Sequence, residues 1–439
     1  MLLIYTPIST PRLQYIFEFI FKDILGLEYK LTKEQEEFKN YTGAKFSYSK
    51  QPLDNELFFS AGKLLFEKGI IEQEINVFDW KDTKVFFATS NKHLFPFDPF
   101  AASFYLLSRY EEYLPHIRDE HERFLPKESL AYKNNFLDKP VINSWAKKIK
   151  ETILEKYPDV VFAQRSYQFI STIDIDNAYA YLEKGFMRTM GAYARSLLHL
   201  NFKEIKERTN VLLGFQKDPY DSYKYQLDLN KTYQFKSIYF FLVGDYGEND
   251  KNISINNRKF QSLIKSIADY AQVGIHPSYG SNKDPIRIKK ELSRLSKVLK
   301  RDVFSSRQHF LKLLLPLTYR RLIDLDIKED YTMGYASEPG FRASTCTPFY
   351  FYDLDTEVTT NLKVYSFAVM DSCLKYYLKI QPEQAIDKIK PLIEEIKKVD
   401  GTFISLWHNE SLGDSNQWRG WKFVYEELIK EALININAS

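Results

Sequence analysis

Residues 167–173 read YQFISTI, and Asp174, Ile175 and Asp176 follow directly. The run is rich in β-branched and aromatic side chains, which predicts a strand. A second run, residues 237–243 (SIYFFLV), is continuously apolar and is typical of a strand buried on both faces. Shorter strand-like runs follow at residues 273–275, 303–305, 365–369 and 402–406. The strand before the two aspartates is therefore predicted to be one of several in a sheet.

Amphipathic helices are expected between these strands. One is predicted after residue 257, because apolar side chains recur there at helical spacing. They are Phe260, Leu263, Ile264 and Ile267. Asp284 and Pro285 have the residue types that open a second helix, as N-cap and first helical residue. Strands that alternate with helices predict a parallel α/β layer or barrel.

The chain divides near residues 155–164. We expect residues 1–160 to form a smaller α/β domain, because short helical and extended patterns mix there, and residues 161–439 to form the main domain. The clearest element of the first part is a helix opened by Asp98 and Pro99.

Composition excludes several classes of protein. The chain has 439 residues, and 61 Lys and Arg stand against 58 Asp and Glu, a net charge of +3. This balance gives no electrostatic reason to expect a nucleic-acid partner. Two cysteines, Cys346 and Cys373, are too few for a disulfide framework or a structural zinc site. The aromatic content of 16% suits sugar stacking, but a coding bias explains it more simply.

No segment predicts export or insertion into a membrane. The first residues, MLLIYTPISTPRL, lack a basic region followed by a sustained apolar stretch. No later run approaches the roughly 18 apolar residues of a membrane span. We therefore expect a cytoplasmic protein without a membrane span, and its protein partners are left open.

Ionisable residues follow the predicted strands, where parallel α/β folds build their sites. Asp174 and Asp176 are spaced so that one carboxylate can bind a metal while the other abstracts a proton from water. His276 follows the strand at 273–275 and has the chemistry of a metal ligand. Arg307 and His309 follow the next strand, as a carboxylate partner and a further ligand. Taken singly, each has a plain alternative as a helix cap, a packed side chain or a surface charge.

Six motifs in order resemble a known family. They are TIDIDN (172–177), GIHPSY (274–279), SRQHF (306–310), GFRA (340–343), MDS (370–372) and SLWHN (405–409). Together they are similar to the polysaccharide deacetylases, that is, the NodB-homology or carbohydrate esterase family 4 domain. The resemblance covers residues 167–421, and the region before it resembles an uncharacterised domain that accompanies one bacterial branch. It implies a distorted (β/α) barrel and a divalent metal, with Zn²⁺ as the expected ion.

The resemblance also implies roles for single residues. Asp174 corresponds to the general base, and Asp176 and His276 to metal ligands. The family's further histidine, four residues after His276, is replaced here by Gly280. Three protein ligands are usual for catalytic zinc, so we expect His309 to complete the set unless the metal is weak or absent.

The remaining roles are assigned with some alternatives open. Arg307 is the first choice to pair with Asp174, and Arg342 competes because FRA resembles the family's arginine motif. His408 resembles the general acid, with Asp371 as the group that orients it.

Two aromatic residues and one histidine pair complete the candidates. Tyr279 and Trp407 would flank the site and stack on a sugar, although Trp407 suits a core position equally. A second metal site at His116 and His121 is disfavoured, because its spacing matches no ligand signature.

The expected function is therefore that of a metal-dependent hydrolase. It would remove acetyl groups from N-acetylated, or O-acetylated, sugars of a polysaccharide or glycan precursor. The alternative is a non-catalytic carbohydrate-binding or assembly protein with a degenerate deacetylase site, which the replacement at Gly280 favours.

Overall fold

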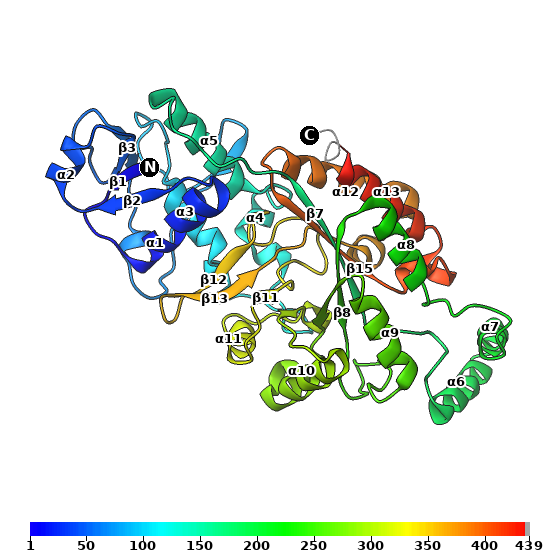
Figure 1. Cartoon of the computed structure of the whole chain (residues 1–439). Coiled ribbons are helices and arrows are strands. Elements are labelled where there is room, and N and C mark those ends of the chain that lie inside the picture. Colours follow the sequence, from blue (N-terminus) through cyan, green and yellow to red (C-terminus); the bar gives the residue numbers. More distant parts are fainter. Residues whose placement is uncertain (435–439) are drawn as a thin grey trace.

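A computed structural model describes residues 1–434, which form a mixed α/β structure with several sheets (Figure 1). The largest sheet has nine strands in the order β12-β13-β11-β10-β9-β8-β7-β15-β14, and only β12 and β13 pair antiparallel. The bounds are β7 Gln168–Ile175, β8 Lys236–Phe241, β9 Gln272–Ile275, β10 Ser305–Ser306, β11 Glu329–Asp330, β12 Phe349–Asp353, β13 Val358–Val364, β14 Val369–Met370 and β15 Thr402–His408.

The register of the central strands brings their carboxyl ends to one edge. Asp174 of β7 pairs with His408 of β15, and Ile175 pairs with Phe241 of β8. Phe241 pairs in turn with Ile275 of β9, and Ile275 with Ser306 of β10. Residues that directly follow these positions must therefore lie close together, although they are far apart in the chain.

Helices connect the strands and surround the sheet, as the alternation predicts. Figure 1 shows α9 and α10 below the central strands and α12 and α13 above them. Asp284 caps α10 by accepting hydrogen bonds from the backbone N–H groups of Ile286 and Arg287. The bounds are α8 Tyr223–Tyr233, α9 Arg258–Ala268, α10 Pro285–Leu299, α11 Leu317–Asp324, α12 Pro382–Lys397 and α13 Trp421–Leu433.

The amino-terminal part contains its own parallel sheet, in the order β2-β1-β3-β4. Its core is aromatic: Phe17, Phe46 and Phe100 pack together, with the rings of Phe17 and Phe100 4.6 Å apart. Helix α3 begins where the sequence predicts, since the Asp98 carboxylate accepts hydrogen bonds from the N–H groups of the first turn. The bounds are β1 Leu2–Tyr5, α1 Pro11–Phe17, β2 Tyr29–Thr32, α2 Gln35–Asn40, β3 Lys45–Ser49, β4 Leu57–Ser60, β5 Phe78–Trp80, β6 Thr83–Val85, α3 Pro99–Leu107, α4 Leu130–Lys133 and α5 Val141–Lys156.

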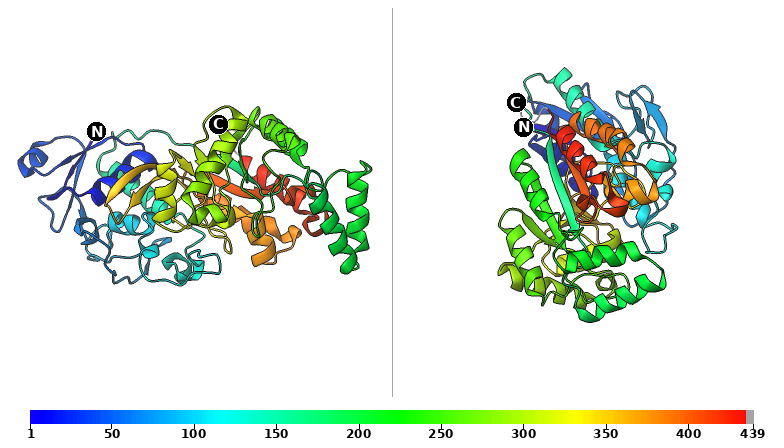
Figure 2. Two further views of the ribbon diagram at one scale, coloured as in Figure 1. Left: turned by 90° about the horizontal axis from the view of Figure 1, so that it is seen from below. Right: turned by 90° about the vertical axis from the view of Figure 1, so that its right-hand side faces the viewer.

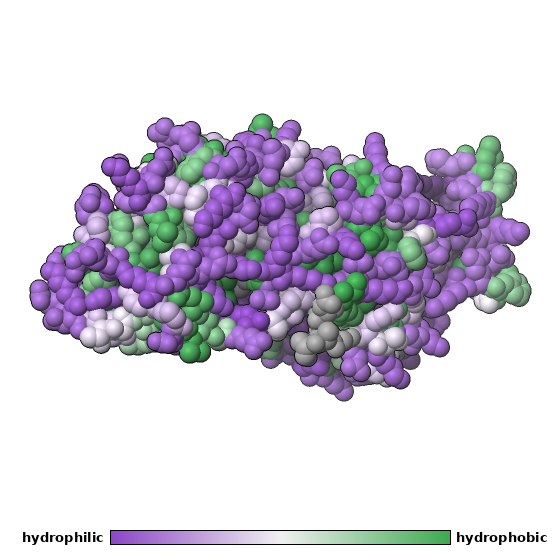
Figure 3. All heavy atoms as spheres, turned by 90° about the horizontal axis from the view of Figure 1, so that it is seen from above, coloured by the Kyte–Doolittle hydropathy of each residue, from purple (hydrophilic) through white to green (hydrophobic). Residues whose placement is uncertain are grey.

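Two helices project from the body of the molecule. α6 (Phe186–Leu198) and α7 (Phe202–Leu212) form a hairpin between β7 and α8, at the end farthest from the amino-terminal sheet (Figures 1 and 2). Hydrophobic residues are visible on the surface at that end (Figure 3). Within residues 1–434, no helix has both the length and the apolar composition that crossing a membrane requires.

Candidate functional site

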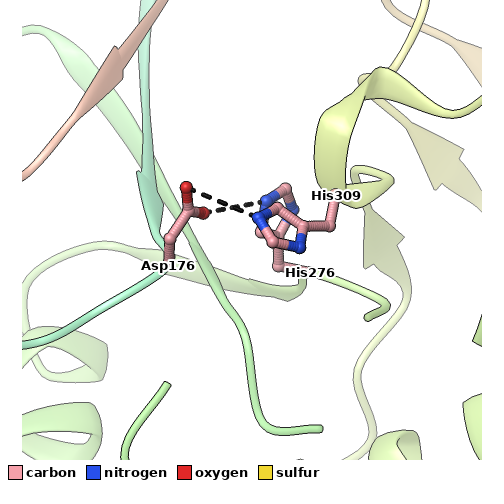
Figure 4. A group of neighbouring side chains, drawn as sticks. All are labelled: Asp176, His276 and His309. Carbon is pink, nitrogen blue, oxygen red and sulfur yellow. Dashed lines mark ion pairs between the residues drawn. The ribbon is translucent and has the colours of Figure 1, made fainter. Parts of the chain in front are cut away.

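Asp176, His276 and His309 converge at the carboxyl edge of the sheet (Figure 4). Asp176 follows β7, His276 follows β9, and His309 comes three residues after β10. Nε2 of His276 lies 3.1 Å from Oδ1 of Asp176, and Nε2 of His309 lies 3.6 Å from its Oδ2. One ligand atom from each residue falls within 4.8 Å of the others. The register of the strands thus brings together three potential ligands from distant parts of the chain.

This group fits a divalent cation. Oδ1 of Asp176 is buried and has no hydrogen-bond partner among the described residues, although the His276 nitrogen is close. Two imidazole nitrogens and one carboxylate are also the donor set that catalytic zinc sites use. The three side chains therefore fit the coordination of a cation better than they fit hydrogen bonding among themselves.

The far nitrogen of each histidine is held by a second partner. Nδ1 of His276 lies 2.5 Å from the backbone oxygen of Arg307, and Nδ1 of His309 lies 2.9 Å from Oδ1 of Asp250. When Nδ1 donates its proton to these acceptors, the lone pair of Nε2 faces Asp176. Both rings are thereby oriented as ligands.

Asp250 is a residue that sequence reasoning missed. It lies in the loop between β8 and α9, where no strand end marks it, and it also accepts a hydrogen bond from the backbone N–H of Tyr279. Burial raises the pKa of Asp250, but the hydrogen bonds from His309 and Tyr279 outweigh it and lower the pKa. A carboxylate that stays ionised can hold the His309 ring in place.

The charges in this cluster shift each other's protonation. Burial raises the pKa of Asp176, but the neighbouring histidines, His309 foremost, together outweigh burial, so the pKa lies well below its usual value. Burial lowers the pKa of His309, yet Asp176 and Asp250 together raise it to about 9. Without an ion, His309 therefore carries a proton at neutral pH, and a cation must displace it.

Asp174 and Arg307 form a buried ion pair beside this group. Nη1 of Arg307 donates to Oδ1 of Asp174 at 3.0 Å, and Nε donates to the backbone oxygen of Tyr331. The guanidinium also lies over the ring of Phe240, 4.8 Å from its centroid. The other oxygen of Asp174 lies 3.8 Å from Nε2 of His276. Asp174 is thus a charged acceptor held next to the ligand group.

His408 and Asp371 form a second pair, on the other side of β7 from His276 and His309. Nδ1 of His408 lies 2.7 Å from Oδ1 of Asp371, whose Oδ2 accepts the backbone N–H of His408. Nε2 of His408 lies 3.9 Å from Oδ2 of Asp176. Burial lowers the pKa of His408, but Asp371 outweighs it and raises the pKa well above its ordinary value. The carboxylate of Asp371 therefore favours the imidazolium form of His408.

Two of the residues expected at the site lie elsewhere. Arg342 is buried and binds Glu112 of the amino-terminal part, 2.6 Å from Nη2 to Oε2, so it is not a partner of Asp174. Trp407 is completely buried against Tyr425 and Trp421, which leaves no face for a sugar. Trp407 belongs to β15, and its side chain points to the opposite side of the strand from that of His408 because side chains alternate along a strand.

Tyr279 and Gly280 lie at the rim of the site. The half-buried Tyr279 ring packs on Phe310, and its hydroxyl lies 3.3 Å from Nδ1 of His121, a residue of the amino-terminal part. Gly280 begins a helical turn, and a Cβ there would meet only the end of the Arg287 side chain, at 2.8 Å. Among residues 1–434, no metal-binding group of this kind includes His116 or His121.

Comparison with known proteins adds distant likenesses. Residues 2–158 match a family model described as a family of unknown function (DUF7033). A comparison with curated protein sequences finds no match.

Three solved structures illustrate the likeness in fold. A Mycobacterium smegmatis protein assigned to the polysaccharide deacetylases has a TM-score of 0.41 at 12% identity, over 63% of this chain and 86% of that one. The polysaccharide deacetylase Bc1974 of Bacillus cereus has a TM-score of 0.30 at 11% identity, over 61% of this chain and 88% of that one. BA3943 of Bacillus anthracis, a CE4 family pseudoenzyme, has a TM-score of 0.29 at 10% identity, over 61% of this chain and 62% of that one. At these scores, the function proposed below rests on the geometry of the site.

Proposed function

We propose that this chain is a metal-dependent hydrolase that removes acetyl groups from N-acetylated, or O-acetylated, sugars. The observation that carries the proposal is the convergence of Asp176, His276 and His309 between two oriented proton-transfer groups, Asp174 and His408. The motif order described above supports a carbohydrate as the substrate. Residues 161–439 would form the catalytic domain, as a distorted (β/α) barrel, and residues 1–160 would form the smaller amino-terminal domain.

The side chains divide the chemistry between them. Asp176, His276 and His309 would hold the cation, expected to be Zn²⁺, which supplies a Lewis acid and lowers the pKa of a bound water. Asp174 accepts the proton of the attacking water, because the Arg307 guanidinium keeps its carboxylate paired and oriented. His408 donates a proton to the departing amine or alcohol, and Asp371 keeps that proton on the ring until then.

The competing function is that of a non-catalytic carbohydrate-binding protein. Gly280 supports it, because it stands where the family has a histidine. His309 argues against it, since an imidazole from the neighbouring strand end lies within reach of Asp176 and is oriented by Asp250. The two functions differ in whether acetate is released.

The test combines metal content with acetate release. Purified chain, reconstituted with Zn²⁺, is expected to hold about one zinc per chain and to release acetate from acetylated amino-sugar oligomers. His309→Ala should lose both properties, because two ligands remain. His199→Ala removes an exposed imidazole at the end of α6 and should retain both. If the wild-type chain binds the oligomers but does not bind zinc and does not release acetate, the carbohydrate-binding function is established instead.

A further inference from the structure

The hairpin of α6 and α7 is built with its polar sides facing each other. The hydroxyl of Tyr193 hydrogen-bonds Oγ1 of Thr209 at 2.8 Å, and Ser196 bonds both Glu204 and Arg208 across the two helices. Arg208 is buried in this contact. Polar contacts, with the Arg208 guanidinium also over the ring of Tyr193, therefore hold the helices together, and the apolar side of α6 is left free for another contact.

The apolar side of α6 faces solvent. Phe186, Met187, Met190, Leu197 and Leu198 recur at helical spacing and cover one stripe of about 120°. The exposed fractions are 76% for Phe186, 81% for Met187 and 82% for Leu198. Other apolar side chains of the hairpin are exposed as well, namely Leu200, Phe202, Leu213 and Phe215. An exposed apolar patch of this extent marks an interaction surface.

The charges on the hairpin select the kind of surface that it meets. Residues 184–217 contain seven basic and two acidic residues, a net charge of +5 in a chain whose total is +3. Arg195, Lys203, Lys206 and Lys217 are exposed, whereas Glu204 and Glu207 are partly buried and bind neighbouring side chains. An apolar stripe bordered by exposed cations is the composition of helices that lie on anionic bilayers.

We propose that the α6–α7 hairpin docks on an anionic lipid surface, with the apolar stripe of α6 inserted at the headgroup boundary. The exposed cations then lie beside the lipid phosphates and carboxylates. The hairpin starts ten residues after Asp176 in the chain. The proposal does not depend on the proposed function, because it involves no residue of the site.

Co-sedimentation of the full chain with vesicles tests this docking. The chain is expected to bind vesicles of equal parts phosphatidylcholine and phosphatidylglycerol, and to bind pure phosphatidylcholine much more weakly. Met187→Ser and Leu198→Ser should each weaken binding about tenfold or more, because each removes most of an apolar side chain that docking buries in the bilayer. Lys203→Gln and Lys206→Gln should each weaken it roughly fivefold, and added salt should have the same effect.

Ile286→Ser is the matched control, since Ile286 is 80% exposed but lies on α10. It should bind as the wild type does. Circular dichroism should be unchanged in the Met187 and Leu198 variants, because these side chains are exposed and belong to no core cluster. The proposal is overturned if the wild type does not bind the anionic vesicles, or if Met187→Ser and Leu198→Ser both bind them as well as the wild type does. A dimer that Leu198→Ser turns into a monomer, without vesicle binding, would overturn it in favour of self-association.

Discussion

At the scale of single residues, the site is organised by what each histidine does with its second nitrogen. Asp250 holds Nδ1 of His309, Asp371 holds Nδ1 of His408, and a backbone oxygen holds that of His276. Each hydrogen bond aims the opposite nitrogen at Asp176. A carboxylate partner also stabilises the imidazolium form, so His408 suits proton donation better than a free histidine would.

Asp371→Asn is expected to change the pH dependence of acetate release. Asp371 raises the pKa of His408, so the imidazolium persists to high pH in the wild type. Without this carboxylate the pKa falls, and the alkaline limb of the kcat profile should move to lower pH by about 1 to 3 pH units. Asp250→Asn is the comparison: it should weaken zinc binding about 10- to 100-fold without moving this limb. An alkaline limb unchanged in Asp371→Asn would show that His408 is not the donor.

At the scale of elements, the short strand β9 positions His276. Gly274 lies in the middle of it, between β8 and β10, where a Cβ would stand 2.5 Å from Cε1 of Phe240 and 2.7 Å from the backbone oxygen of Ser305. The backbone of β10 cannot move away without disturbing Arg307 and His309. The close approach of these strands thus depends on a residue without a side chain.

Gly274→Ala is expected to destabilise the protein by about 1 to 3 kcal/mol, because overpacking forces the neighbouring strands apart. Zinc binding should weaken as well, since His276 is two residues away. Urea unfolding and a zinc titration measure the two effects. Gly191→Ala is the control: Gly191 lies in α6 with open space around its Cα, and alanine there should leave stability equal or up to about 1 kcal/mol higher. Equal stability of the two variants would contradict this role of Gly274.

At the scale of the whole molecule, buried charges join the amino-terminal part to the large sheet. Glu112 lies between Arg109 and Arg342, and Nη2 of Arg109 also contacts the hydroxyl of Tyr335. Burial raises the pKa of Glu112, but the two guanidinium groups lower it to about 2. Because these residues come from both parts of the chain, we expect the two parts to unfold in one transition.

Glu112→Gln is expected to lower the free energy of unfolding by about 3 to 5 kcal/mol, because it leaves the buried Arg342 guanidinium without a counter-charge and leaves Arg109 with Glu111 alone. In the wild type, the stabilisation by Glu112 is fully present above pH 4.5, and it is lost as the pH falls towards 2. Denaturation at pH 7 and at pH 3 measures both effects. Glu427→Gln breaks a partly exposed pair with Lys430 and should cost no more than about 1 kcal/mol. A loss of the same size in both variants would refute a special role for Glu112.

The sequence alone determined the parts of this protein that depend on local patterns. Three kinds of feature could be predicted, because periodicity and capping act over a few residues. They are strand β7, the helices capped by Asp98 and Asp284, and the ionisable residues that follow β7, β9 and β10 in the chain. The tertiary structure decided the rest. Asp250 comes to His309 from a loop without a recognisable pattern, Arg342 turns to Glu112, 230 residues away, and Trp407 turns into the core.

The physical reason is that a buried charge or ring is placed by its partners and not by its neighbours in the chain. The +5 charge of residues 184–217 could be counted in advance, but a helix pattern does not say which face is covered. Only the packing of α6 on α7 through polar contacts decided that the apolar stripe faces outward. Short-range patterns determine where strands and helices form, and long-range pairing determines which side chains meet.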